Sequence, residues 1–262
     1  MIIASYSSLK DYNSCKRKVY YRINRAPRLE TASMLVGSTI HNMVEDVENG
    51  DWLGEDEYIK QLVTRLSSGN VKFYPGQKVP SLINHVKLCF ENYKAVAGRL
   101  QPLYGVEVPF EIEYHSSDVK VVGKFDQLRG DVDTIVELKS TVKKPTAAFL
   151  NTDMQSTIYL WAFQQIYGTM PNYFHVHLPS GTVYRLVRDD FDDLILNLTD
   201  YIKDRDEQNF PRQLDGYGCE RCDYYDICIR PEIPEDNGKV EFVARGHFDY
   251  STISPTKRFA EV

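Results

Sequence analysis

The sequence lacks long apolar runs and an excess of positive charge, and each absence narrows the class of protein. No run of about 18 apolar residues occurs, so we expect no transmembrane helix and no membrane partner. The first residues lack a basic segment followed by a long apolar one, which predicts no secretory signal and a cytoplasmic location. With 31 basic and 37 acidic residues, the formal charge of −6 argues against binding nucleic acid by bulk charge alone. A local basic, tyrosine-bearing stretch at Lys10–Arg28 fits either a phosphate backbone or a solvated helix face.

Cysteine is also scarce, and the five cysteines are an odd number, which argues against a disulfide framework. Three of them lie close together at Cys219, Cys222 and Cys228, and Cys15 lies far upstream. Clustered thiols are typical of metal or cluster ligation, and four of them suit structural Zn²⁺ or a [4Fe–4S] cluster. Spacing alone leaves both alternatives open. Cys89 has apolar neighbours and is predicted to be a buried structural thiol.

Hydrophobic periodicity predicts helices, then strands, then helices and strands again. The ranges expected to be helical are residues 5–23, 32–48, 56–66, 80–100, 146–167 and 189–207. The ranges expected to be strands are residues 106–114, 119–128, 133–140, 172–178 and 182–188, the first three forming an antiparallel meander. This order predicts an α/β (α+β) fold in which helices pack on a mixed sheet.

The meander contains an aspartate followed by a Glu-x-Lys pair. Glu137 and Lys139 are two apart on one strand and therefore share a face, and Asp126 lies on the strand before. Three charged groups on one sheet face cost stability unless they are compensated, and a divalent cation would compensate the two carboxylates. Taken by itself, the pattern also fits an exposed ion pair on a hairpin.

Two more pairs of polar residues have helical spacing. His41 and Glu45 are four apart in the predicted helix 32–48, and Gln155 and Tyr159 are one turn apart in the helix after the Glu-x-Lys strand. Each pair also fits an ordinary surface or packing face. His175 and His177 share a strand face; we expect half-exposed strand residues there, with metal binding as the alternative.

The sequence therefore contains four motifs in a fixed order: Gly37-x3-His41-x3-Glu45, Gly123-x2-Asp126, Glu137-x-Lys139 and Gln155-x3-Tyr159. In this order and on these elements they resemble the RecB-like branch of the PD-(D/E)XK nuclease superfamily. The resemblance covers roughly Ser5 to Cys228. It implies a restriction-endonuclease-like core and a metal-dependent deoxyribonuclease.

The metal ligands expected from these motifs are mostly oxygen atoms. Asp126 and Glu137 supply hard oxygens suited to Mg²⁺ or Mn²⁺, and the backbone carbonyl of Leu138 adds another. His41 supplies a nitrogen ligand, which shifts the preference towards Mn²⁺. Glu45 is expected either to bind with His41 or only to orient it.

Lys139 is expected beside the attacking water, where it orients the water or helps to deprotonate it and stabilises charge on the phosphorane. The resemblance implies that Gln155 and Tyr159 face the site and contact DNA or position Lys139.

The cysteine spacing resembles that of RecB-like nucleases related to the CRISPR-associated adaptation nucleases and to the AddB helicase–nuclease subunit. In these relatives one cysteine precedes the core and three follow it, and together they hold a [4Fe–4S] cluster. The resemblance implies the same for Cys15, Cys219, Cys222 and Cys228, with Zn²⁺ as the alternative. Lys16 follows Cys15 where many members have proline.

The predicted organisation has four parts: residues 1–31 carrying the first cysteine; residues 32–210 forming the nuclease core with a helical insertion at about 50–104; residues 211–230 forming the cysteine module; and residues 231–262 forming a tail of unknown role. The expected function is an exonuclease acting on end-bearing or single-stranded DNA in phage recombination, DNA repair or CRISPR adaptation. Expected partners are DNA, recombination or adaptation proteins and a second copy of the chain, in a bacterial, archaeal or phage-infected cell. The alternatives are an inactive DNA- or protein-binding factor on the same fold and a structure-specific endonuclease.

Overall fold

The computed structural model describes residues 1–28, 30–69, 71–213, 219 and 222–229 of the chain. The predicted tail at 231–262 lies outside the described residues, as does part of the predicted cysteine module at 211–230. No helix in the described part of the chain is both long and apolar enough to cross a membrane.

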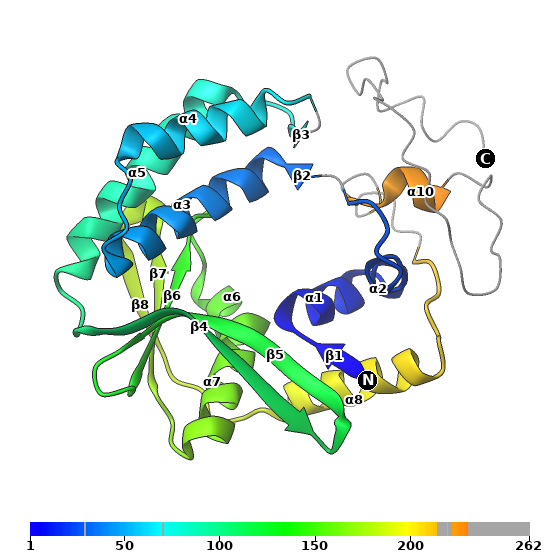
Figure 1. Cartoon of the computed structure of the whole chain (residues 1–262). Helices are drawn as coiled ribbons and strands as arrows, with labels where there is room; N and C mark the ends of the chain where they lie inside the picture. Colours follow the sequence, from blue (N-terminus) through cyan, green and yellow to red (C-terminus); the bar gives the residue numbers. More distant parts are fainter. Residues whose placement is uncertain (29, 70, 214–218, 220–221, 230–262) are drawn as a thin grey trace.

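Six strands form one mixed sheet at the centre of the molecule (Figure 1). They are β1 (Ile2–Ala4), β4 (Leu103–Tyr114), β5 (Ser116–Arg129), β6 (Thr134–Lys139), β7 (Asn172–His177) and β8 (Thr182–Leu186). The order across the sheet is β1-β5-β6-β7-β8, and β4 also pairs with β5. Strands β4 to β6 form the predicted antiparallel meander, whereas β6 and β7 run parallel. The short β1, which pairs in parallel with β5, was not predicted because three residues are too few to show a period.

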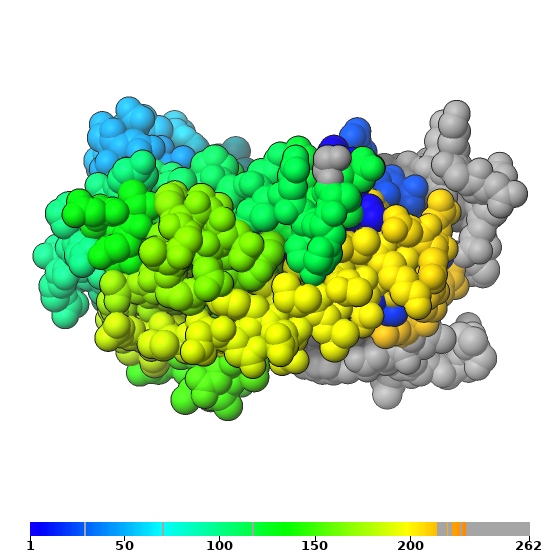
Figure 2. Space-filling model, turned by 90° about the horizontal axis from the view of Figure 1, so that it is seen from below, coloured from blue at the N-terminus to red at the C-terminus, as the bar shows by residue number. Residues whose placement is uncertain are grey.

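Helices cover both faces of this sheet. Ile135 and Tyr173 pack in one core with helices α1 (Tyr6–Ser14), α7 (Met154–Tyr167) and α8 (Asp192–Asp206). The next residue on β6, Val136, packs in a second core with helices α3 (Ala32–Asn49), α4 (Glu55–Leu66) and α5 (Val79–Ala97). Successive strand residues point to opposite faces, so the two cores lie on the two sides of the sheet. Figure 2 views the molecule from below, where the yellow α8 lies along the surface beside the yellow-green part of the chain.

Two helices predicted as continuous are each divided in two. The range 146–167 forms α6 (Ala147–Thr152) and α7, because Asp153 is extended and its carboxylate accepts the Ser156 N–H at 2.9 Å as the cap of α7. The N-terminal range forms α1 and α2 (Lys16–Ile23), with the extended Cys15 between them. Ser5 caps α1, as its place in the sequence predicts.

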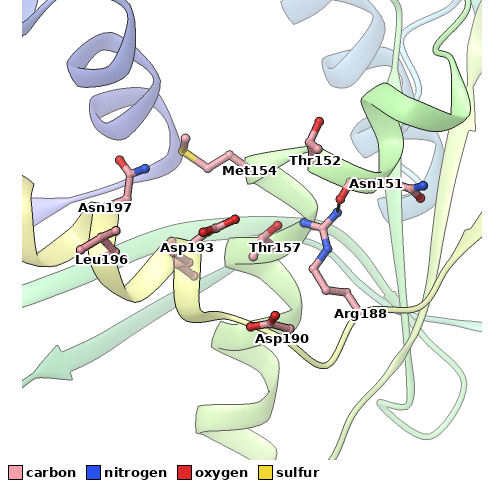
Figure 3. A pocket seen from close by; sticks show the side chains of 10 residues that line it. Asn151, Thr152, Met154, Thr157, Arg188, Asp190, Asp193, Leu196 and Asn197 are labelled. Carbon is pink, nitrogen blue, oxygen red and sulfur yellow. Dashed lines mark hydrogen bonds between the residues drawn. The ribbon is translucent and has the colours of Figure 1, made fainter.

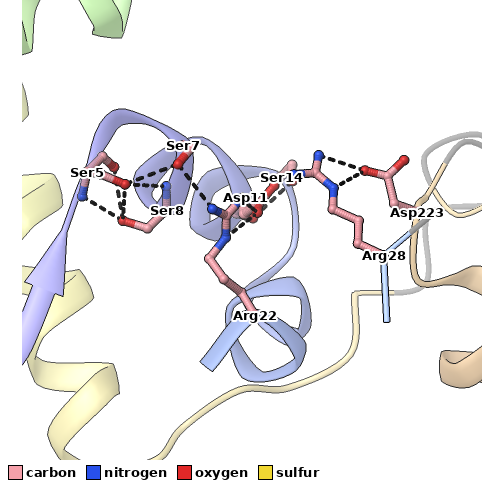
Figure 4. A network of polar contacts seen from close by, with 8 residues as sticks. All are labelled: Ser5, Ser7, Ser8, Asp11, Ser14, Arg22, Arg28 and Asp223. Carbon is pink, nitrogen blue, oxygen red and sulfur yellow. Dashed lines mark hydrogen bonds and ion pairs between the residues drawn. The ribbon is translucent and has the colours of Figure 1, made fainter. Parts of the chain in front are cut away.

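The N-terminal helices contact the short helix α10 (Tyr225–Ile229) and the residues just before it. The rings of Tyr21 and Tyr224 lie 5.3 Å apart in a small core that also includes Cys222 and Cys228. Figure 4 shows the polar side of this contact, where Arg28 donates to Asp223 at 2.8 Å. Residues 222–229 therefore pack against α2 and the residues that follow it.

Candidate functional site

The meander brings the predicted carboxylates and lysine together at the ends of β5 and β6. The register pairs Gln127 with Val136, so Asp126 lies next to Glu137 on the neighbouring strand. Asp126 Oδ2 accepts a hydrogen bond from the backbone N–H of Leu138 at 2.8 Å, which fixes the carboxylate against β6. Glu137 is 1% exposed and its Oε1 accepts a hydrogen bond from Lys139 Nζ. These contacts are those of a buried charged cluster, and they exclude an exposed hairpin ion pair.

Helix α7 supplies the next two residues of the site. Lys139 Nζ donates to Gln155 Oε1 at 2.6 Å, and Gln155 Nε2 donates to the hydroxyl of Tyr159 at 3.1 Å. The predicted Gln-x3-Tyr pair therefore faces the Glu-x-Lys strand, and both residues are buried. The hydrogen bond to Tyr159 orients the amide of Gln155 so that its oxygen accepts the hydrogen bond from Lys139.

Gly123 of the Gly-x2-Asp motif has a steric reason to be glycine. It pairs across the strands with Phe110, whose ring lies so close that a Cβ at position 123 would overlap it. The Phe110 ring in turn packs against Phe125 at 4.8 Å and edge-on against Tyr159 at 5.9 Å. The glycine therefore allows an aromatic cluster to support the tyrosine of the site.

The histidine of α3 reaches the site from the other side and meets a carboxylate that the motifs did not include. His41 Nδ1 lies 3.5 Å from Oε1 of Glu107, a residue of β4. Donor atoms of His41, Glu107 and Asp126 all lie within 4.8 Å of one another. The register explains this, because Val106 and Val108 pair with Gln127 and Phe125, so Glu107 lies opposite Asp126.

Glu107 could not be singled out in the sequence, where it is one of three glutamates in its strand. Its φ of 47° lies in the left-handed region, which a residue with a long side chain rarely adopts. Such strain is typical of functional positions. The side chain of Glu45, the predicted partner of His41, makes no hydrogen bond or ion pair with another described residue, and its role stays a prediction.

The buried charges of the site shift one another's pKa values. Burial, together with the charge of Asp126, raises the pKa of Glu137 to about 8. Burial also raises the pKa of Asp126, although the nearby His41 and Lys139 oppose this. For Lys139, burial lowers the pKa, but Glu137 and Asp126 outweigh it and the net shift is upward. The negative charge of the carboxylates in the site thus exceeds the positive charge of its basic side chains.

The pKa of His41 reflects the same excess of negative charge in the site. Burial lowers its pKa, but the hydrogen bond with Glu107 and the charges of Asp126 and Glu137 raise it to about 9. The hydrogen bond with His41 is also the main reason that the pKa of Glu107 is lowered. The carboxylates thus stabilise a positive charge at this position of the site.

The two histidines of β7 are buried, with exposures of 1% for His175 and 2% for His177, so the prediction of half-exposed residues was wrong. The reason is that β7 lies between β6 and β8 under helices on both faces. His177 Nε2 donates to the carbonyl of Thr141 at 2.9 Å, and its Nδ1 bonds to Ser180 at 2.8 Å. Burial lowers the pKa of His175 to about 4, so it is neutral near pH 7. Neither histidine belongs to the group of candidate ligands found in the described residues.

A separate cavity of about 450 Å³ lies between the end of α6, the start of α7 and the start of α8 (Figure 3). Its lining contains both polar and apolar side chains, among them Thr157, Arg188 and Asp193. None of the predicted site residues lines it. The cavity is therefore distinct from the carboxylate–lysine cluster.

A family model of the PD-(D/E)XK nuclease superfamily matches residues 3–229, which include every element of the site. The chain belongs to the PD-(D/E)XK nuclease superfamily. Membership in this superfamily implies a nuclease, a hydrolase that acts on DNA with the help of divalent metal ions. The mixed sheet with helices on both faces agrees with the predicted fold class.

Two solved structures resemble the chain at low sequence identity. One is from Eubacterium rectale and is described as a “Putative exonuclease”; it is 14% identical, with a TM-score of 0.57 over 98% of this chain and 93% of that one. The other, SSO0001, is 15% identical with a TM-score of 0.45 over 87% of each chain, and no argument rests on it. The first supports the fold alone. No curated protein matches the chain.

Proposed function

We propose that this member of the superfamily is a metal-dependent exonuclease that hydrolyses phosphodiester bonds of end-bearing or single-stranded DNA. The observation that carries the proposal is the convergence of Asp126, Glu137 and Lys139 with His41 and Gln155. Lys139 is bonded on one side to Glu137 and on the other to Gln155, next to two carboxylates with raised pKa values. A purely structural cluster would gain nothing from this excess of buried negative charge.

The donor set fits a divalent cation. Three donor atoms already lie within 4.8 Å of one another, and Oε2 of Glu137 is buried without a hydrogen-bond partner in the described structure. We assign Mn²⁺ or Mg²⁺ to His41, Glu107, Asp126 and Glu137, with the carbonyl of Leu138 as a further oxygen ligand. When bound, the cation activates water and neutralises the scissile phosphate.

The side chains of the site have separable tasks. The carboxylates raise the pKa of Lys139, so its ammonium stays protonated, which suits it to orient the attacking water and stabilise charge on the phosphate rather than to remove a proton. Gln155 holds Nζ of Lys139 in place, and Tyr159 holds the Gln155 amide. Glu45 lies one turn from His41 on α3 and remains proposed as an orienting residue.

The biological setting is proposed from the RecB-like motifs: phage recombination, DNA repair or CRISPR adaptation, in the cytoplasm of a bacterial, archaeal or phage-infected cell. The description of the Eubacterium rectale protein agrees with an exonuclease. Recombination or adaptation proteins and a second copy of the chain are the partners that this setting suggests. The four predicted parts of the chain, with their boundaries at 31, 210 and 230, are proposed on the same basis.

The alternatives are a structure-specific endonuclease and an inactive binding factor on the same fold. The test is a time course with Mn²⁺ or Mg²⁺ on linear DNA labelled at either end, single- or double-stranded, beside closed circular DNA and chelator controls. We expect loss of label from ends and intact circles. Lys139→Ala should abolish hydrolysis, whereas Lys120→Ala, which removes a surface lysine from β5, should not. Cut circles would favour the endonuclease, and undiminished cleavage by Lys139→Ala would exclude the assigned site.

We further propose that Cys15, Cys219, Cys222 and Cys228 hold a [4Fe–4S] cluster, with Zn²⁺ as the alternative, and that it fastens the two ends of the chain together. The contact of Tyr21 with the aromatic core around Cys222 and Cys228 supports this. Within the described residues, however, no three of these sulfur atoms lie within 4.8 Å of one another. The ligand set therefore rests on the resemblance in cysteine arrangement to the RecB-like nucleases.

The cysteine proposal is tested by iron, sulfide and zinc analysis of anaerobically purified protein, with its visible absorbance. We expect about four irons per chain and their loss in Cys15→Ala. Cys89→Ala is the matched control, because Cys89 is buried in the core of α5 away from the other four. A Cys15→Ala protein with unchanged metal content, fold and activity would exclude the fastening role.

A further inference from the structure

Lys139 and Gln155 are joined by a hydrogen bond of 2.6 Å, so the residues between them form a loop that begins and ends at the candidate site. The stretch Thr141–Phe149 in this loop, here called the 141–149 segment, is exposed throughout except for the half-buried Pro145. Val142 is 81% exposed and Phe149 is 53% exposed. Large apolar side chains held in water beside a catalytic site are a reason to look for a ligand.

The start of the segment is fixed by two histidines. His85 Nε2 of α5 donates to the carbonyl of Ser140 at 2.6 Å, and His177 Nε2 of β7 donates to the carbonyl of Thr141 at 2.9 Å. Both bonds hold the backbone and leave the side chains that follow free to contact a ligand.

The far end is fixed by one arginine. Arg188 donates to the carbonyls of Leu150 and Asp153 at 3.0 Å each, at the break between α6 and α7. It also donates to the carbonyl of Asn151, and this bond is drawn in Figure 3. Thr146 also caps α6 by accepting the Phe149 N–H at 3.1 Å. A segment held at both ends loses little conformational entropy when a ligand binds.

The segment is also positively charged. Lys143 and Lys144 are exposed, and neither makes an ion pair with a carboxylate of the described chain. Other surface lysines do, such as Lys94 with Glu91 at 2.6 Å. In a chain with a net charge of −6, two adjacent unpaired lysines that follow the catalytic strand suit an anionic ligand.

We propose that the 141–149 segment binds a single DNA strand next to the catalytic site. Lys143 and Lys144 contact its phosphates, and the ring of Phe149 stacks on an unpaired base. Exposed aromatic rings combined with basic side chains are the usual means of binding single strands, whereas the base faces of a duplex are covered by its own stacking. This inference rests on the proposed function for its ligand, DNA, and adds that the ligand is single-stranded at this position.

The experiment measures binding in the presence of a chelator, so that no hydrolysis interferes. Fluorescence anisotropy is followed with a labelled oligothymidylate of about 20 nucleotides and with a blunt hairpin duplex. The variants are Lys143→Gln with Lys144→Gln, Phe149→Ala and Phe149→Trp. The control is Lys94→Gln with Lys120→Gln, which removes the same charge from two paired surface lysines.

We expect the double lysine variant to bind the single strand about tenfold more weakly and to lower the slope of log affinity against log salt by about 1.4, or 0.7 for each lost phosphate contact. Phe149→Ala should weaken single-strand binding by about five- to a hundredfold, and Phe149→Trp should preserve it. The affinity for the hairpin duplex should change little in either Phe149 variant. The control should bind as the wild type does.

Unchanged single-strand affinity in both the lysine and Phe149→Ala variants would overturn the proposal. An equal loss for the duplex and the single strand on Phe149→Ala would also overturn it, because stacking would not be involved. Hydrolysis by the wild-type protein is assayed separately with Mn²⁺. A protein that binds through the segment but never hydrolyses DNA would disprove the nuclease function and leave this binding surface standing.

Discussion

Arg129 Nη2 donates a hydrogen bond to Glu48 Oε1 at 2.9 Å, which joins the strand that carries Asp126 to the helix that carries His41. The same guanidinium donates to Gln127 Oε1 and to the carbonyl of Gln101, each at 2.9 Å. Arg129 is 3% exposed. Gln127 directly follows Asp126 in β5, and Glu48 lies on α3 with His41, so the network helps to set the distance between α3 and β5 and thus where His41 meets the carboxylates.

Replacing Arg129 by Met should lower the free energy of unfolding by about 3–5 kcal/mol. It leaves the buried Gln127 oxygen without its donor and the partly buried Glu48 without its cation, bonded only to the Tyr93 hydroxyl. Urea denaturation measures this. Arg65→Met is the control, because Arg65 makes an exposed ion pair with Glu30, and its loss should cost about 1 kcal/mol or less. Equal effects of the two changes would show that the buried network contributes no more than a surface pair.

Asp126→Asn separates the charge of the carboxylate from its hydrogen bond. The amide oxygen can still accept from the Leu138 N–H, so the hairpin should keep its form. Hydrolysis should fall about a hundredfold or more, because a metal ligand loses its charge. In chelator, the variant should be at least as stable as the wild type, since Asp126 and Glu137 repel each other. Asp118→Asn, an exposed change on the same strand, is the control, and a clearly destabilised metal-free Asp126→Asn would contradict this account.

Glu107→Gln tests whether Glu107, which the sequence motifs did not include, is a metal ligand. The change removes one of the three groups that converge and should weaken Mn²⁺ binding by at least about tenfold. Isothermal titration calorimetry measures it. Glu111→Gln changes an exposed glutamate of the same strand that pairs with Lys120, and it should bind Mn²⁺ as the wild type does. Equal affinities for both variants would remove Glu107 from the ligand set.

The comparison of sequence and structure shows which interactions are local. The positions of Asp126, Glu137 and Lys139 followed from strand alternation and a short turn, which depend on residues close together in the chain. Glu107 did not follow, because its place opposite Asp126 depends on a register interrupted by a shift between Leu103 and Gly105. A local sequence pattern predicts which face of a strand a residue lies on, whereas its neighbour on the next strand depends on how the strands pair.

The break at Asp153 and the burial of His175 were missed for related reasons. The range 146–167 reads as one helix because a capping aspartate can also stand inside a helical pattern. The carbonyls of Leu150 and Asn151 at the end of α6 accept hydrogen bonds from Arg188, which is far away in sequence. His175 is buried because β7 pairs on both sides, a fact of sheet order that a single strand does not reveal. Predictions from one sequence fail where tertiary partners decide.

Gly123→Ala should destabilise the protein by about 1–3 kcal/mol, because the new Cβ would overlap the Phe110 ring and displace it from Phe125 and Tyr159. Thermal unfolding measures the loss. Combining it with Phe110→Leu should recover part of the stability, since the smaller side chain makes room. Gly98→Ala is the control, as a Cβ there would touch no atom closer than 3.9 Å. Additive losses in the double variant would show that the two residues do not clash.

Asp204 provides a pH-dependent test of how the N-terminal helices are held. Its buried carboxylate accepts hydrogen bonds from Tyr12 and Lys16 and, at 2.8 Å, from Asn209. Burial by itself would raise the pKa of Asp204, but these bonds outweigh it and lower the pKa from its ordinary value of 3.8. The ionised carboxylate therefore stabilises the fold fully above pH 3.8, and this stabilisation is lost as the pH falls through the lower folded-state pKa.

Asp204→Asn should consequently cost about 1–3 kcal/mol of unfolding free energy at pH 7, the worth of hydrogen bonds to a charged group, and progressively less as the pH falls below 3.8. Urea denaturation of both proteins at a series of pH values measures the difference. Asp200→Asn, an exposed change on the same helix, is the control and should cost less than about 0.5 kcal/mol at pH 7. A cost for Asp204→Asn that stays constant down to the acid-unfolding limit would mean that packing, and not the ionised carboxylate, holds α1 and α2 against α8.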